Sequence, residues 1–203
     1  MINPALTSWH RHARTCLTIM WAAAIAGPAS VTSLAAQKQA LDAKSSEVAP
    51  RGQREVKDIT FGDWQKLCFK PGGAPALCRT SITGKFPTGQ TAVRLDLIER
   101  DGDHTARLQL FVPVGMYLKQ PAKLTVDQGR EQLMPYTWCL ANACIAADVA
   151  DPNFIAAMDS GKALVLEVVD SSLLSVTTLL PLAQFASAHK GPPAKMFVQD
   201  IDE

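Results

Sequence analysis

Four cysteines downstream of an N-terminal apolar segment constrain the fold of this chain more than any other feature. Residues 17–26 form a short apolar stretch behind the basic residues Arg11 and Arg14, and small residues follow it up to Ala35. This order is typical of a secretory signal peptide, and an N-terminal membrane anchor, the alternative, needs a longer apolar stretch. We therefore predict that residues 1–35 are a signal peptide and that the rest of the chain is exported.

Export makes the remaining cysteines candidates for disulfides, because exported proteins fold in oxidising compartments. Four cysteines allow three pairings. A turn rich in Pro and Gly at residues 71–75 returns Cys78 to a position beside Cys68. Cys139 and Cys144 flank a short turn of their own. Local geometry therefore favours pairing within each of the two close pairs.

Zinc binding and redox chemistry are the alternatives for these cysteines. Nine residues separate Cys68 from Cys78, whereas zinc ligands in such pairs lie two to four residues apart. The four residues between Cys139 and Cys144 break the Cys-x-x-Cys spacing of redox-active pairs. We therefore expect structural disulfides, no metal ion and no other cofactor.

Alternation of apolar and polar residues predicts a domain built mostly of β-strands. Leu95 and Leu97 alternate with polar residues, and so do Leu108 and Leu110. An Asp-Gly turn at residues 101–103 connects these two runs. Alternating runs joined by an Asp-Gly turn are typical of a β-hairpin. Further short runs bring the expected number of strands to about seven.

Two short helices interrupt the strands. Asp151 followed by Pro152 predicts a helix start, because Asp accepts hydrogen bonds from free N–H groups and Pro suits the first turn. Gly161 predicts the end of this helix, and Leu182 and Phe185 mark a second one. The predicted fold class is all-β: a mainly antiparallel β-sandwich or barrel-like domain with two short helices, stapled by disulfides.

Composition divides the exported part of the chain. Residues 36–57 contain almost no large apolar side chain and predict a flexible linker. Residues 58–190 form the β domain, and residues 191–203 form a polar tail. Without residues 1–35, 18 basic residues face 19 acidic ones, a balance that argues against a nucleic-acid partner. No later stretch reaches transmembrane length, so we expect no transmembrane segment in the mature chain.

The titratable residues predict no catalytic site. His104 lies in the predicted hairpin turn, and His189 lies at the end of the last helix, where a cation suits the helix dipole. Paired acids at residues 101–103 and 148–151 offer too few oxygen ligands for a calcium loop. We therefore predict no catalytic residue and a protein that is not an enzyme.

Aromatic and apolar side chains near the cysteines form a candidate surface for a partner or ligand. Core packing is the alternative for them, because large aromatic residues dominate small β cores. The candidates are Trp64, Phe111, Met116, Tyr117, Tyr136 and Trp138. The alternative function is a periplasmic carrier of a small molecule or lipid, with a pocket lined by Phe111, Val114, Met116 and Tyr117.

Four stretches, in order, carry a resemblance to a known family. They are Gly62-Asp63-Trp64 with Cys68, Pro75 and Cys78; the apolar residues 110–118; residues 124–127 leading to Tyr136, Cys139 and Cys144; and Gly161-Lys162 with the closing strands and Phe185. Across about residues 61–188 this order resembles the invasion-associated locus B family of exported proteins from Gram-negative bacteria. Ala143 departs from the glycine that usually precedes the fourth cysteine in that family.

The resemblance implies an envelope-associated all-β protein with no established enzymatic activity and no catalytic residues to transfer. The family takes its name from a role in host-cell invasion. We therefore expect a non-enzymatic periplasmic protein whose domain binds an envelope or host protein, in host-cell invasion or in envelope integrity. Peripheral association with the outer membrane and secretion are the alternatives for its location.

Overall fold

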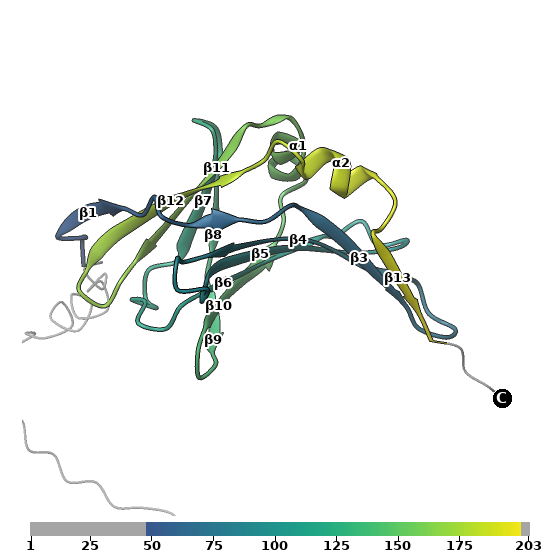
Figure 1. Ribbon diagram of the computed structural model, residues 1–203, viewed down its shortest axis with the longest axis horizontal. Helices are drawn as coiled ribbons and strands as arrows, with labels where there is room; N and C mark the ends of the chain where they lie inside the picture. The colour runs from purple at the N-terminus through teal and green to yellow at the C-terminus, as the bar shows by residue number, and fades with distance from the viewer. Residues whose placement is uncertain (1–47, 200–203) are drawn as a thin grey trace, which may run out of the picture. The chain divides into compact units, whose positions relative to one another are not determined.

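The structure, a computed structural model, describes residues 48–199, which fold into two packed β-sheets (Figure 1). Sheet A has the strand order β1-β12-β11-β7-β8. Its strands are β1 (Gly52–Glu55), β7 (Ala122–Val126), β8 (Glu131–Met134), β11 (Ala163–Val169) and β12 (Leu174–Pro181). The predicted signal peptide, residues 1–35, lies outside the described residues.

Sheet B has the order β13-β3-β4-β5-β6-β10-β9, and a short strand β2 pairs with β4 as well. Its strands are β2 (Thr60–Phe61), β3 (Gln65–Lys70), β4 (Leu77–Lys85), β5 (Thr91–Arg100), β6 (Arg107–Val112), β9 (Tyr136–Cys139), β10 (Cys144–Val149) and β13 (Lys195–Val198). Neighbouring strands are antiparallel except in the pairs β1–β12 and β13–β3. The mainly antiparallel sandwich predicted from the sequence is confirmed.

The β5–β6 hairpin is the centre of sheet B and follows the predicted alternation. Leu95 lies opposite Leu110 and Leu97 opposite Leu108, and all four side chains are fully buried against sheet A. Gly102 in the connecting turn has a φ of 78°, a conformation that glycine adopts without strain. The apolar sides of both strands therefore face the core, as predicted.

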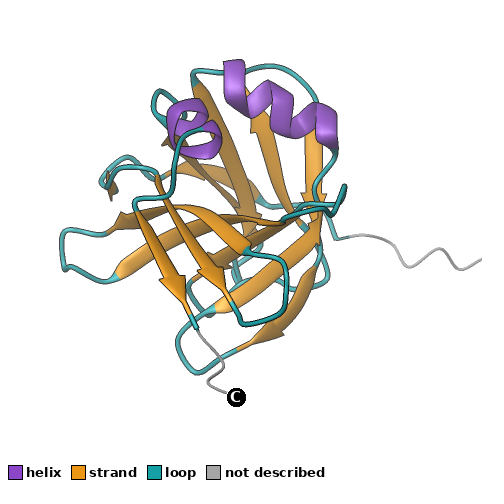
Figure 2. Cartoon of the chain, turned by 90° about the vertical axis from the view of Figure 1, so that its right-hand side faces the viewer, coloured by secondary structure: helices purple, strands orange, loops and turns teal. Residues whose placement is uncertain are grey.

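Two helices cover one end of the sandwich (Figure 2). In α1 (Pro152–Ser160) the Asp151 side chain accepts a hydrogen bond from the Asn153 N–H at 2.8 Å, which confirms the predicted cap. The second helix, α2 (Phe185–Lys190), buries Phe185 completely. No helix within residues 48–199 is both long and apolar enough to cross a membrane.

The core side chains differ in size between the two ends of the sandwich. Next to the helices the sheets enclose large side chains: Trp64, Phe154, Met158 and Phe185. At the other end, beside β1, the buried residues are mainly short aliphatic ones such as Val93, Val112 and Val168. The helix end is therefore filled by bulky residues, and the β1 end is not.

Two segments of the chain differ from the prediction. Residues 52–55, inside the predicted flexible linker, form β1, and residues 195–198, inside the predicted polar tail, form β13. The Arg51 N–H donates to the Leu173 carbonyl at 2.7 Å, and the Val56 N–H donates to the Thr177 carbonyl at 2.8 Å. These hydrogen bonds join backbone groups, so a strand can form even where its side chains are polar and exposed. For this reason amino-acid composition does not predict either strand.

Both predicted disulfides are present. Cys68–Cys78 joins directly opposite residues of β3 and β4, and Cys139–Cys144 joins opposite residues of β9 and β10. Each bond therefore closes a local hairpin instead of linking distant parts of the domain.

We expect the Cys68→Ala/Cys78→Ala double variant to lose about 2–3 kcal/mol of unfolding free energy, because a closed loop of this length limits the unfolded chain. Urea unfolding measures this loss. Reduction of the unmodified protein should add the mass of four hydrogens, two for each disulfide. A free thiol at Cys68, Cys78, Cys139 or Cys144 in the unreduced protein would contradict the disulfide assigned to that cysteine.

Candidate functional site

The six residues predicted as one surface lie in separate parts of the domain. Trp64 is only 6% exposed; its Nε1–H donates to the Pro181 carbonyl at 2.7 Å, and its ring packs edge-on against Phe185 at 4.8 Å. Trp64 therefore belongs to the core at the helix end, as the core-packing alternative expected, and not to an exposed surface.

Tyr136 and Tyr117 are also not part of one exposed surface. Tyr136 packs partly buried against the core, and its hydroxyl has no hydrogen-bond partner among the described residues. This burial raises the pKa of Tyr136 well above its ordinary value. Tyr117 is half-buried in the turn after β6, where its N–H donates to the Val169 carbonyl at 2.7 Å.

Phe111 and Trp138 do share one face, the outer face of sheet B. The strand register places Arg94 of β5, Phe111 of β6, Ile145 of β10 and Trp138 of β9 in one row across four strands. Directly opposite residues of paired strands project from the same face. Ile145 is almost completely buried between its two aromatic neighbours in this row, whereas Trp138 is 48% exposed at the sheet edge.

Arg94 is held in place within this row. Its guanidinium lies over the Phe111 ring, 3.7 Å from the ring centre. Its Nη2 also lies 3.0 Å from an oxygen of Asp96, a carboxylate that is only 1% exposed. A buried carboxylate requires such a partner, so Arg94 and Phe111 present a fixed cationic and aromatic pair.

A groove of about 760 Å³ runs beside this row. Arg94 and Phe111 line it from the strands, Val114 from the turn after β6, and Leu140 from the β9–β10 turn. Val114 and Leu140 are both about half exposed. We call Arg94, Phe111, Val114, Trp138 and Leu140 the Phe111 surface.

Met116 belongs to a second hollow, a cavity of about 520 Å³ between the two sheets at the β1 end. The pocket predicted for a carrier combined Met116 with Phe111, Val114 and Tyr117. The structure separates them: Met116 lines the cavity, Phe111 and Val114 line the outer groove, and Tyr117 lines neither. The predicted four-residue pocket is therefore wrong.

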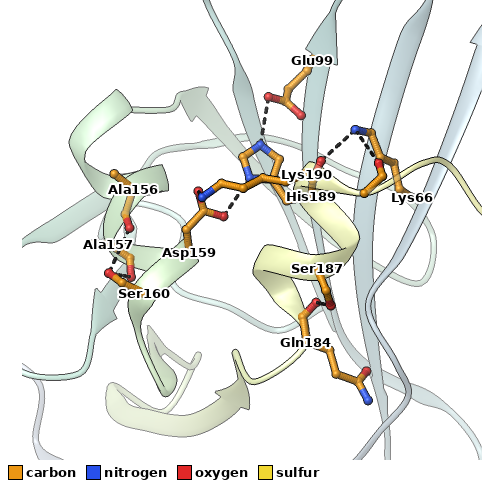
Figure 3. A network of polar contacts seen from close by, with 11 residues as sticks. Lys66, Glu99, Ala156, Ala157, Asp159, Ser160, Gln184, Ser187, His189 and Lys190 are labelled. Atoms are coloured by element: carbon orange, nitrogen blue, oxygen red, sulfur yellow. Dashed lines mark hydrogen bonds and ion pairs between the residues drawn. The ribbon is translucent and has the colours of Figure 1, made fainter.

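His189 occupies a polar network that sequence analysis missed (Figure 3). Its Nδ1 lies 2.9 Å from an oxygen of Asp159, at the end of α1, and its Nε2 lies 3.1 Å from an oxygen of Glu99 on β5. The Lys66 Nζ donates to the His189 carbonyl at 2.7 Å. The network thus joins both helices to sheet B.

The position between two carboxylates favours the charged form of this histidine. Both ring nitrogens can donate only in the imidazolium form. The hydrogen bond to Glu99 raises the pKa of His189 most, and the one to Asp159 adds to this increase, while partial burial opposes them. An imidazolium with both N–H groups engaged stabilises the helix end; it is not a free base for catalysis.

The other paired acids have structural roles. Asp103 accepts hydrogen bonds from the N–H and hydroxyl of Thr105, in the β5–β6 turn. Asp151 caps α1 and also lies 2.7 Å from Nη1 of Arg130. Within residues 48–199 no group of three His, Cys, Asp or Glu side chains is placed to hold a metal ion.

The sequence model of one protein family, the invasion associated locus B (IalB) protein, matches residues 64–193. The chain belongs to the IalB family. This match confirms the resemblance found in the sequence motifs. IalB is not known as an enzyme family.

A solved structure supports the same fold. The crystal structure of invasion associated protein B from Bartonella henselae superposes with a TM-score of 0.57 over 64% of this chain and 90% of that chain, at 24% sequence identity. No curated protein sequence matches the chain. At this identity the likeness shows the shared IalB fold alone.

We expect Trp64→Phe to lower the free energy of unfolding by about 1–3 kcal/mol, because it removes the hydrogen bond to Pro181 and leaves space in the core. Trp138→Phe is the matched control, and its exposed position predicts a change within about 0.5 kcal/mol. Urea unfolding of both variants measures the difference. Equal losses would contradict the buried placement of Trp64.

The His189 network predicts a pH-dependent stability. Because folding raises the pKa of His189 above its ordinary value near 6.5, its stabilisation is complete below pH 6.5 and is lost as the pH rises through the folded-state pKa. Below pH 6.5, His189→Gln should cost about 1.5–3 kcal/mol, and this cost should shrink at higher pH. Urea unfolding across this range tests it. His104→Gln, in an exposed turn, should keep the slope of the unmodified protein, and an unchanged slope in His189→Gln would contradict the assignment.

Proposed function

We propose that this IalB protein is an exported, non-enzymatic envelope protein whose β domain binds a protein partner through the Phe111 surface. The observation that carries the proposal is the row of Arg94, Phe111 and Trp138 beside the exposed Leu140 and Val114. Aromatic residues and arginine are enriched where proteins bind one another, and a few of them supply most of the binding energy.

The rigidity of this surface supports the proposal. The Cys139–Cys144 disulfide closes the hairpin that carries Trp138 and Leu140. Asp96 holds Arg94, which in turn lies over Phe111. A surface that is already ordered before binding loses less conformational entropy when a partner docks.

Export is supported by the two disulfides, which persist in oxidising compartments, and by the N-terminal sequence. We place the protein in the periplasm, with peripheral association with the outer membrane or secretion as alternatives. Family membership is the support for a role in host-cell invasion or envelope integrity. The partner in that role is an envelope or host protein, and the function requires neither a cofactor nor a metal ion.

The engagement of His189 supports a non-enzymatic role. Both ring nitrogens of His189 are engaged by carboxylates. Acid–base catalysis by histidine needs a ring nitrogen within reach of substrate.

Crosslinking in intact cells tests the partner surface. A photo-reactive amino acid at position 140 should capture one protein reproducibly, identified by mass spectrometry. Position 179 is the matched control, because Leu179 is as exposed as Leu140 but lies on the outer face of sheet A. No captured protein from position 140, or equal capture of the same protein from position 179, would overturn the proposal.

Once the partner is purified, Trp138→Ala should weaken its binding by about tenfold or more, as expected for an exposed aromatic residue that a partner buries. Leu179→Ala should leave the affinity unchanged. Titration calorimetry measures both variants, and their urea unfolding shows whether each is folded. Unchanged affinity in a folded Trp138→Ala variant would count against the Phe111 surface.

A further inference from the structure

The cavity between the sheets follows from the size of the side chains around it. Trp64, Phe154, Met158 and Phe185 fill the helix end of the sandwich. At the β1 end the facing residues are Val93 and Val112 from sheet B and Leu166, Val168 and Val176 from sheet A. Branched aliphatic side chains of this size do not span the separation that the bulky end sets, and a cavity of about 520 Å³ is left.

The walls of this cavity are apolar, and its size is within the range of about 300–1,000 Å³ found for ligand pockets. One polar wall group, the Thr178 hydroxyl, is already engaged, because it donates to the Val56 carbonyl at 3.1 Å. An aliphatic chain can pack against such an apolar wall without leaving a polar group of the wall unpaired.

Charged residues line the cavity together with these walls, and they come from β1, from the segment that follows it and from the β11–β12 turn. Arg54 lies 4.0 Å from Asp170, and Glu55 lies 3.1 Å from Lys57, so these four charges are paired. Asp58 also lines the cavity and forms no ion pair within residues 48–199. The unpaired charge at the cavity is therefore the negative charge of Asp58.

We propose that this cavity binds a single-chain amphiphile with a cationic head group. The alkyl chain enters between the sheets, against Val112, Val168 and Val176, and the head group lies at the edge beside Asp58. Burial of the alkyl chain supplies affinity, because its methylene groups are removed from water. Asp58 selects a cation over an anion of the same chain length. None of the five residues that define the Phe111 surface lines this cavity, and the proposal does not rest on the proposed partner binding.

The purified protein should bind dodecyltrimethylammonium, used below its micelle concentration, and calorimetry measures the affinity. Laurate, an anionic probe with a similar chain, should bind at least tenfold more weakly. No binding of dodecyltrimethylammonium would overturn the site, and equal or tighter binding of laurate would overturn the cationic head group.

Val168→Phe tests the position of the alkyl chain, because the larger ring fills the cavity. It should reduce the affinity for dodecyltrimethylammonium at least tenfold. Val165→Phe is the matched control: it makes the same change on the same strand, at a residue that alternates to the opposite face of sheet A, and should leave affinity unchanged. If Val168→Phe does not fold, Val176→Phe on the paired strand replaces it. Equal losses in the cavity variant and in Val165→Phe would overturn the site.

Asp58→Asn tests the head group. It should lower the affinity for dodecyltrimethylammonium about three- to tenfold. The affinity for dodecanol, a neutral probe of the same chain length, should stay unchanged. Asp63→Asn, which removes an exposed acid outside the cavity, is the control. If Asp58→Asn lowers the affinities for dodecanol and for the cationic probe equally, the charge contact is contradicted.

Discussion

The register of the β5–β6 hairpin determines both the core and the outer surface of this domain. Leu95 and Leu97 pair with Leu110 and Leu108 on the inner face, and the same register puts Arg94 opposite Phe111 on the outer face. Because side chains alternate with a period of two residues, a shift by one residue would turn the leucines to solvent and Phe111 to the core. The leucines are fully buried, so their burial also fixes where the Arg94–Phe111 pair lies.

Local features explain why much of this fold could be predicted from the sequence. The β5–β6 hairpin, the Asp151 cap and both disulfides depend on residues close together in the chain, and each has a distinct pattern of residue types. β1 and β13 have no such pattern, because backbone hydrogen bonds to β12 and β3 hold them while their side chains stay largely exposed. Composition predicts burial, and these edge strands bury little.

The candidate site was harder to predict because it depends on contacts across long sequence separations. Phe111 and Trp138 appeared in the predicted set, but so did Trp64, whose Nε1 partner is a carbonyl 117 residues away. His189 was assigned to a helix dipole, whereas its partners lie 30 and 90 residues away in Asp159 and Glu99. Amphipathic residues such as Trp, Tyr and His occur both in cores and on surfaces, and only the fold separates the two cases.

The cavity between the sheets and the groove beside Phe111 share a wall. Phe86, Val112 and Pro113 line both the cavity between the sheets and the groove of the Phe111 surface. A chain that enters the cavity therefore contacts residues that also shape the outer groove. If the two ligands prefer different positions of this wall, each changes the affinity of the other by the same factor. Pro113 follows directly after β6 and has a fixed φ. The end of the central hairpin is therefore the element that lines both the cavity and the groove.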